Sequence, residues 1–298
     1  MPDNRIPAFV NLDSGSGQAA REALDASGAF DVEPCNPGLL DRQIAQVVHS
    51  GADRVVVAGG DGTVAKAASA LVGTRTALAV VPGGTLNHFA RDHGIPTDHA
   101  EAAQVSAAGH TTTTDVATLN GRLFLNTSSV GAYVLFVRTR ERLEQYFGYH
   151  VATFLAGLRL LGRVRPFTVE LSLDGAMRQY RSALVFVGVG ERELQLPSIG
   201  SRAENGRRGL HVIVVRGGTW ARLIAAGFMA VLGGTDAIAR GTLADSFVVD
   251  ECRIELRRRL GRVAIDGEIV EMASPLVFRI ERDALRLGVP ARVETDAA

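Results

Sequence analysis

The sequence predicts an N-terminal doubly wound (Rossmann-like) α/β domain followed by an antiparallel β-sandwich domain. Strand and helix patterns alternate over roughly the first 120 residues, and the strands there are continuous apolar runs. After about residue 118 the pattern changes to short runs, several of them alternating, which turn residues separate. The 298 residues suffice for two ordinary domains, and 46% of them are hydrophobic, which is ample for two cores.

The first domain is placed at residues 1–118, with 284–298 returning to it. IPAFVNL is an apolar run that ends in the turn cluster DSGSG, and QAAREALDAS then has a helix-forming composition. LLDRQIAQVVHSG places five aliphatic side chains on one helical stripe, namely Leu39, Leu40, Ile44, Val47 and Val48. DRVVVA and TALAVV flank the helical segment TVAKAASALVG and do not alternate, which is typical of strands covered on both faces. Repeated βαβ units of this kind predict a doubly wound parallel sheet.

The second domain is placed at residues 119–283. Its strand-like runs, separated by turn signals, are GRLFLNTSSVG, FTVELSLDG, RQYRSALVFVGVG, GLHVIVV, DECRIELRRR, GRVAIDGEIVEM and PLVFRIER. The stretch 138–165 interrupts them with an apolar helical stripe that has arginines clustered at its ends. Two interpretations of this stripe stay open: a helix packed on the sandwich, or an apolar wall for acyl chains with arginines meeting lipid headgroups.

Composition restricts the partners and the compartment. Lys and Arg together number 32, as do Asp and Glu, so no net charge attracts nucleic acid and we expect no such partner. Cys35 and Cys252 are too few for a disulfide framework, and the N-terminus shows no secretory signal. The most apolar long stretch, 219–234, is too short for a membrane span and contains Arg222. We therefore expect a cytoplasmic protein that can still contact the inner membrane surface.

The strongest predicted strand ends in a glycine loop, RVVVAGGDGTVAKAASAL (54–71). Its glycines permit positive φ angles and close approach of a ligand, and the following helix N-terminus suits phosphate oxygens. Asp61 does not suit that cradle as a bare anion, so it either holds a metal ion or anchors the loop by accepting backbone N–H groups. The alternative is an ordinary strand-to-helix turn with Asp61 or Thr63 as its cap.

Two further turns reach the same edge of the predicted sheet. The next strand ends in Gly83, Gly84 and Thr85, and a weaker polar turn after the first strand contains Asn11, Ser14, Gly15 and Gly17. Three converging loops suit a polyphosphate better than one loop does. The pattern matches neither G-x-G-x-x-G nor the P-loop, so any nucleotide site here is a different solution.

The order of these motifs resembles the catalytic domain of the diacylglycerol kinase and sphingosine kinase superfamily, in its bacterial lipid kinase form. The resemblance is carried in sequence order by NLDSGSG (11–17), GGDGT (59–63), PGGTLNHFARD (82–92), FLNTSSVG (124–131), SRAENGRRGLHV (201–212) and DGE (266–268). GGDGT alone also occurs in NAD kinases and, more loosely, in phosphofructokinases. Its combination with PGGTLNHFARD and a late DGE is more specific.

The resemblance implies an ATP-dependent, Mg²⁺-assisted transfer of the γ-phosphoryl group to a hydroxyl of a lipid such as diacylglycerol. It implies nucleotide binding by the following residues of the three loops: Asn11, Gly59, Gly60, Asp61, Gly62, Thr63, Gly83, Gly84, Thr85 and Asn87. It further implies catalytic roles for Asp61, for Glu268 as the general base and for Asp266 as the partner of Glu268. The acceptor would lie in an active-site cleft between the domains. Asp266-Gly267 also predicts a hairpin turn.

Three departures from the family pattern bear on metal binding and on the loops. His88 stands where the family often has an aspartate that joins Asp61 and a later acidic residue, here Asp115. Asn205-Gly206 replaces the usual Asp-Gly of a metal loop, and an amide oxygen is a weaker Mg²⁺ ligand than a carboxylate. Asn205 and Asp61 are the candidate metal ligands. The third departure is minor: Leu12 stands where the family usually has proline.

Two alternatives to a lipid kinase follow from the same residues. One is an NAD kinase-like phosphotransferase acting on a soluble acceptor, although the Asn-Glu dipeptide usual in those proteins does not occur here. The other is a non-catalytic nucleotide-binding regulator, which His88 and Asn205 motivate. The sequence leaves open which lipid is phosphorylated. By analogy with the family, we expect transient membrane contact and a homodimer.

Overall fold

The computed structural model divides into two compact units. It describes residues 5–36, 38–131, 167–193, 201–203, 205–216, 244–256 and 259–291, and isolated positions between 134 and 155. One unit comprises residues 1–116 and 282–298, and the other comprises residues 117–281. The chain passes between the units within strands β5 (Thr111–Leu119) and β15 (Leu276–Gly288). Most of the stretch 138–165 lies outside the described residues, so neither interpretation of it is decided.

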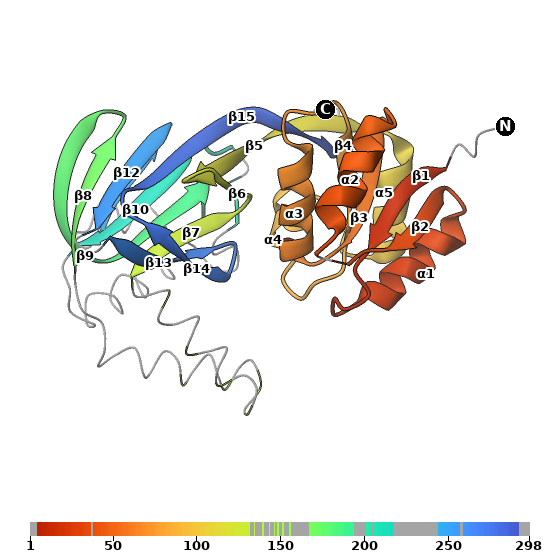
Figure 1. Ribbon diagram of the computed structural model, residues 1–298, viewed down its shortest axis with the longest axis horizontal. Helices are drawn as coiled ribbons and strands as arrows, with labels where there is room; N and C mark the ends of the chain where they lie inside the picture. Colours follow the sequence, from red (N-terminus) through yellow and green to blue (C-terminus); the bar gives the residue numbers. More distant parts are fainter. Residues whose placement is uncertain are drawn as a thin grey trace, which may run out of the picture. The chain divides into compact units, whose positions relative to one another are not determined.

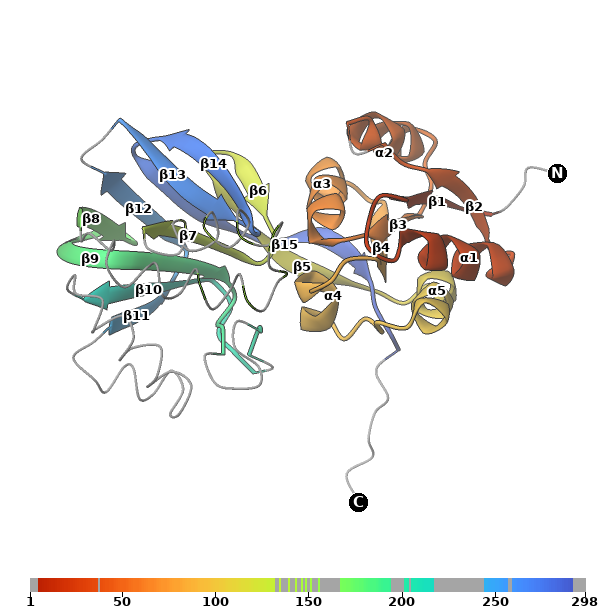
Figure 2. The same ribbon diagram turned by 90° about the horizontal axis from the view of Figure 1, so that it is seen from below.

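The first unit is a parallel sheet with helices on both faces. Its strands lie in the order β2, β1, β3, β4 and β15. Its strands and helices are β1 (Ile6–Val10), α1 (Gly17–Ser27), β2 (Phe30–Pro34), α2 (Leu40–His49), β3 (Arg54–Gly59), α3 (Asp61–Leu71), β4 (Ala77–Pro82), α4 (His88–Asp92) and α5 (His99–Ala108). Helices α2 and α3 pack together over one face and α1 and α5 over the other, as Figures 1 and 2 show.

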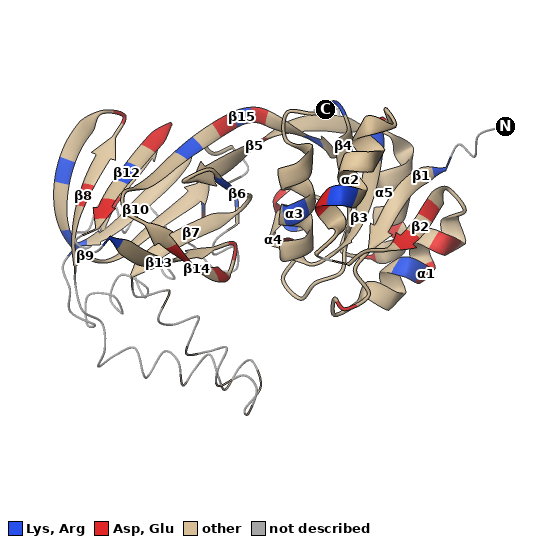
Figure 3. Ribbon diagram, viewed as in Figure 1, with Lys and Arg blue, Asp and Glu red and all other residues tan. Residues whose placement is uncertain are grey.

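The central strands of this sheet are buried along almost their whole length. Every residue of β4 and all residues of β3 after Arg54 are buried, because helices cover both faces. The middles of β3 and β4 carry no charged residue, whereas α1, α2 and α3 do (Figure 3). The uninterrupted apolar runs in the sequence therefore correspond to strands with two covered faces.

The described part of the second unit consists mainly of antiparallel strands. They are β6 (Arg122–Phe124), β7 (Thr127–Gly131), β8 (Phe167–Leu173), β9 (Ala176–Val189), β10 (Leu210–Arg216), β11 (Ala244–Val249), β12 (Glu251–Leu256), β13 (Leu260–Ile265), β14 (Glu268–Ala273) and the first part of β15. The main path runs β14, β13, β7, β9, β8, β12 and β15, with β10 joined to β9 and β11, and β6 to β5. Inward side chains such as Val169, Leu171, Val185 and Val187 form one apolar core.

The predicted fold class, an N-terminal α/β domain followed by an antiparallel strand-rich domain, is confirmed. The two cysteines are free and buried in it, and burial raises the pKa of the Cys252 thiol to about 12. None of the helices in the described part of the chain has both the length and the apolar character that crossing a membrane requires.

His211 is a fully buried titratable group on β10 of the second unit. Its Nδ1 accepts the N–H of Arg192 at 2.9 Å, so its proton is on Nε2, which donates to the Ser246 hydroxyl at 2.8 Å. Burial lowers the pKa of His211 to about 4; the positive charges of Arg207 and Arg192 act in the same direction and Glu191 opposes them. The imidazole therefore stays neutral at pH values where an unfolded histidine is charged.

We expect His211 to make the folded state less stable in mild acid. Between its folded pKa of about 4 and its unfolded value of 6.5, only the unfolded chain takes up this proton. The free energy of unfolding therefore falls as the pH drops, by about 3 kcal/mol over the whole window. Urea unfolding at pH 7 and pH 5 should show about 2 kcal/mol of this loss in the wild type and much less in His211→Asn, whose amide oxygen can still accept the Arg192 N–H. The exposed His49→Asn is the control, and an undiminished loss in His211→Asn would contradict the assignment.

Candidate active site

Three loops of the first unit are joined into one structure where β1, β3 and β4 end. Asn11, directly after β1, donates its backbone N–H to Ala58 and its side-chain amide to the Thr63 hydroxyl, both at 2.9 Å. Ser16 donates its backbone N–H to the Gly83 carbonyl at 3.0 Å. The loops that the sequence placed at one edge of the sheet are thus in direct contact.

The glycines of the second and third loops allow two backbones to touch. A Cβ atom at Gly84 would lie 2.7 Å from the Gly60 Cα, and one at Gly83 would lie 3.0 Å from the Gly59 Cα. None of these four glycines uses the positive φ angle that glycine permits, and Gly60 has a φ of −82°. The contact between the loops is the physical requirement here, because any side chain would push the backbones apart.

We predict that Gly84→Ala separates the two loops. The added methyl group overlaps a backbone atom, which cannot move as a flexible side chain can, so a loss of about 1–3 kcal/mol in the free energy of unfolding is expected. Urea unfolding measures this loss. Gly15→Ala is the matched control in the first loop, because a Cβ there meets nothing closer than the Gly83 carbonyl oxygen at 3.9 Å. Equal stability of the two variants would contradict the steric argument.

Asp61 joins the β3–α3 loop to the start of α4. Its Oδ2 accepts the backbone N–H of His88 at 3.2 Å, and its Oδ1 accepts that of Phe89 at 3.1 Å. Of the two roles predicted for this carboxylate, the structure displays the anchor. The alternative in which Asp61 or Thr63 caps α3 does not hold, since Gly60 is the N-cap and no side chain caps it. Each Asp61 oxygen retains a second lone pair, so the carboxylate can still coordinate a metal ion while it accepts these two N–H groups.

The third loop is closed by Asn87, a residue with φ of +49°. Its side-chain oxygen accepts the Gly84 N–H at 2.9 Å, and its side-chain amide donates to the Gly84 carbonyl at 2.7 Å. Thr85 and Gly62 are exposed beside this arrangement. His88 contributes its backbone N–H to Asp61, a contact that any residue except proline can make at this position.

The predicted DGE segment forms the β13–β14 hairpin turn of the second unit. Asp266 and Gly267 have φ angles of +45° and +89°, which suit a tight hairpin. The Asp266 carboxylate accepts three backbone N–H groups at 2.8–2.9 Å, those of residues 125–127. Glu268 begins β14 with its side chain 58% exposed, and its carboxylate meets the Arg122 guanidinium at 2.7 Å. The sequence analysis did not identify Arg122 as a site residue, because only its charge distinguishes it in the sequence.

Comparison with known proteins identifies the relatives of this arrangement. Residues 5–119, which contain all three loops, match the model of the diacylglycerol kinase catalytic domain. Over this segment, which is less than half of the chain, the protein is similar to the diacylglycerol kinase-like family. The predicted resemblance to that family is therefore confirmed.

Single relatives agree with this family over different lengths. The diacylglycerol kinase of Staphylococcus aureus (strain bovine RF122 / ET3-1) is 29% identical over 198 residues, which are 62% of this chain and 62% of that protein. A Bacillus anthracis str. Sterne protein proposed to be a diacylglycerol kinase is 25% identical, with a TM-score of 0.74 over 96% of this chain and 95% of that one. A crystal structure of a diacylglycerol kinase from the same organism shares the fold at 22% identity, with a TM-score of 0.69 over 97% and 98% of the two chains.

The similarity to diacylglycerol kinases implies a Mg²⁺ ion, and the residues present fit such an ion only in part. Asp61 fits, because a single carboxylate together with phosphate oxygens is a usual Mg²⁺ environment. Asn205 is exposed, and the nearby Glu191 carboxylate accepts the Arg207 N–H at 2.9 Å, which lowers the pKa of Glu191. In the described part of the chain, no three His, Cys, Asp or Glu side chains gather as a metal cluster. The metal roles of Asn205 and Asp61 stay predictions.

Asp115, the expected third acidic residue of this family, is buried in the first unit. Only 3% of it is exposed, and its carboxylate accepts the backbone N–H of Asp283 on β15 at 3.0 Å. This contact ties β5 to the last strand of the same sheet. The contribution of Asp115 to an acidic network with Asp61 stays a prediction.

Proposed function

We propose that the protein is an ATP-dependent lipid kinase that transfers the γ-phosphoryl group to a hydroxyl of a lipid such as diacylglycerol. The observation that carries the proposal is the union of three strand-end loops in the first unit by Asn11, Asp61 and the Gly60–Gly84 contact. Open α/β sheets bind ligands at such carboxyl ends. The match of the same residues to a diacylglycerol kinase catalytic domain supports a kinase reaction.

In this proposal the first unit holds the nucleotide phosphates. Helix α3 begins at Asp61. The Thr63 N–H donates to the Gly60 carbonyl at 2.9 Å, so the N–H groups of Asp61 and Gly62 are the ones without an acceptor within the helix. These two N–H groups and the exposed Thr85 hydroxyl offer donors to phosphate oxygens. Mg²⁺ bound at Asp61 would neutralise phosphate charge beside the carboxylate.

Glu268 of the second unit is the proposed general base. A lipid alcohol is a poor nucleophile, and a carboxylate can take its proton as the new oxygen–phosphorus bond forms. The bond between the γ-phosphorus and the bridging oxygen breaks, and ADP leaves with that electron pair. Asp266 supports this role through the backbone of residues 125–127, whose N–H groups its carboxylate holds. Because such acceptors reside in bilayers, we also propose transient contact with a membrane surface.

A radiolabelled-phosphate assay with a panel of acceptors tests the proposal. The purified chain is incubated with γ-labelled ATP and Mg²⁺, and with diacylglycerol, phosphatidylglycerol, a sphingoid base, a polyprenol, NAD or no acceptor. Label in the lipid extract is the expected result and names the acceptor class. Label in NADP would instead establish the soluble-acceptor alternative, and nucleotide binding without any transfer would establish the regulator.

A further inference from the structure

We propose that Arg122 is a positioning residue that fixes the carboxylate of Glu268 for proton transfer. This inference rests on the proposed function, because it assumes that Glu268 is the base. The Arg122 guanidinium contacts the Glu268 Oε2 at 2.7 Å, and the two residues lie on different hairpins, β5–β6 and β13–β14. The ion pair therefore spans two supersecondary elements within the second unit.

Stability alone does not account for this ion pair. The side chains are 45% and 58% exposed, and exposed pairs of this kind usually contribute less than about 1 kcal/mol. The same β13–β14 hairpin carries a second ion pair, Arg262–Glu271, at 3.0 Å with exposures of 52% and 59%. That pair joins directly opposite residues of one hairpin, which is the ordinary cross-strand arrangement.

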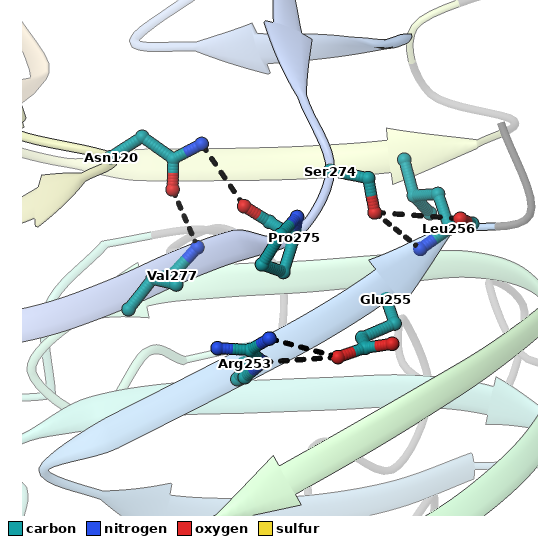
Figure 4. Close-up of polar contacts among 7 residues, drawn as sticks. All are labelled: Asn120, Arg253, Glu255, Leu256, Ser274, Pro275 and Val277. Carbon is teal, nitrogen blue, oxygen red and sulfur yellow. Dashed lines mark hydrogen bonds and ion pairs between the residues drawn. The ribbon is translucent and has the colours of Figure 1, made fainter. Parts of the chain in front are cut away.

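The segment that carries Arg122 is fastened to its surroundings on one side by Asn120. Its side-chain amide donates to the carbonyls of Ala273 and Pro275 at 3.0 and 3.1 Å, and its side-chain oxygen accepts the Val277 N–H at 2.8 Å. Figure 4 shows the hydrogen bonds from the Asn120 side chain to the backbone of Pro275 and Val277. Its own backbone N–H adds a bond to the Val277 carbonyl at 2.9 Å. The turn next to Arg122 is thus fixed to the connection between β14 and β15.

On the other side of Arg122, the segment is fastened by Asp266 and by an aromatic contact. The Asp266 carboxylate holds the N–H groups of residues 125–127. Phe124, fully buried, meets the ring of Phe278 edge to face at 6.2 Å between centroids. Contacts on both sides therefore fix the position of the Arg122 main chain. Asp266, which makes some of these contacts, lies two residues before Glu268.

A long, exposed glutamate side chain ordinarily samples several rotamers, and restricting them costs conformational entropy. Because the hairpin that carries Arg122 is held in place, its guanidinium favours one rotamer of Glu268 before the substrate binds. The other oxygen, Oε1, bonds to no residue in the described part of the chain and is then left to accept the proton of the acceptor hydroxyl. Asp266 contributes to the position of both partners of the ion pair, because it forms the turn before Glu268 and accepts the N–H groups of the segment after Arg122.

The test compares Arg122→Gln with the matched control Arg262→Gln, using dioleoylglycerol in mixed detergent micelles as the acceptor. We expect kcat to fall about 10- to 100-fold in Arg122→Gln with the KM for ATP unchanged, and to stay at the wild-type value in Arg262→Gln. Both variants should unfold at the wild-type urea midpoint, because both ion pairs are exposed. Arg122→Lys should recover part of kcat, since it restores the charge without the planar fork. Millimolar methylguanidinium should raise kcat of Arg122→Ala but not that of Arg262→Ala.

Failure of the inference is distinguishable from failure of the proposed function. If Glu268→Gln abolishes transfer while Arg122→Gln and Arg262→Gln behave alike, the positioning role is wrong and the kinase assignment survives. If Glu268→Gln retains full activity, the assigned base is wrong and with it the role of Arg122. A fall in kcat that neither lysine nor methylguanidinium reverses would also overturn the positioning role.

Discussion

Asp61→Ala should lower phosphoryl transfer by at least about 100-fold while the protein stays folded. The substitution removes the acceptor for the His88 and Phe89 N–H groups, so the start of α4 loses its link to the glycine loop of α3. It also removes the carboxylate that fits Mg²⁺ beside a phosphate chain. Losses of this size are typical when a charged group that stabilises a transition state is removed.

The structure offers a matched control for this variant in the same unit. Asp98 is the N-cap of α5, and its carboxylate also accepts two backbone N–H groups, those of Ala100 and Glu101 at 3.0 Å. Both alanine variants should lose about 1–2 kcal/mol of unfolding free energy, which is usual for a capping carboxylate. Only Asp61→Ala should lose turnover. Steady-state kinetics and urea unfolding of the pair separate catalysis from helix anchoring, and full activity in Asp61→Ala would refute its assigned role.

Glu268→Gln should reduce kcat by about 10²- to 10⁴-fold and leave the KM for ATP unchanged. Glutamine keeps the size of the side chain and one oxygen near Arg122, but it cannot accept the proton of an alcohol. Stability should not change, because the side chain is 58% exposed. The expected pattern is a defect in the chemical step alone.

Glu271→Gln is the control for this second variant. Glu271 lies on the same strand, is 59% exposed and pairs with an arginine, Arg262, so it matches Glu268 in strand, exposure and type of partner. Stopped assays over a range of ATP and acceptor concentrations give kcat and KM for both. Equal kcat values in the two variants would remove Glu268 from the reaction.

The parts of the fold that were predictable are those in which burial dictates the sequence. Strands β3 and β4 are covered on both faces and read as continuous apolar runs, whereas the edge strand β2 exposes Asp31 and Glu33 and gave no clear signal. Helix α5 was also missed, because its buried residues are Ala102, Ala103 and Ser106, which are too small to stand out as an apolar stripe. Local sequence patterns therefore predict elements with large buried side chains and do not predict those whose buried side chains are small.

For the candidate site, the sequence located the loops but not their contacts. Strand ends and glycine pairs predicted that three loops share one edge, and this is so. The reason for the glycines, backbone contact between Gly60 and Gly84, depends on two segments 24 positions apart and is visible only in three dimensions. The Arg122–Glu268 ion pair likewise joins residues 146 positions apart. Long-range pairing of single polar residues leaves no periodic trace in a sequence.

The return of β15 to the first unit has a practical consequence for anyone who wishes to produce that unit alone. A fragment that stops at residue 116 lacks Leu285 and Leu287, both fully buried, and bares the edge of β4 where Leu287 pairs with Leu78. Uncovered strand edges invite aggregation. Splicing residues 282–291 back onto such a fragment, for example by circular permutation, is the route to a first unit that folds on its own.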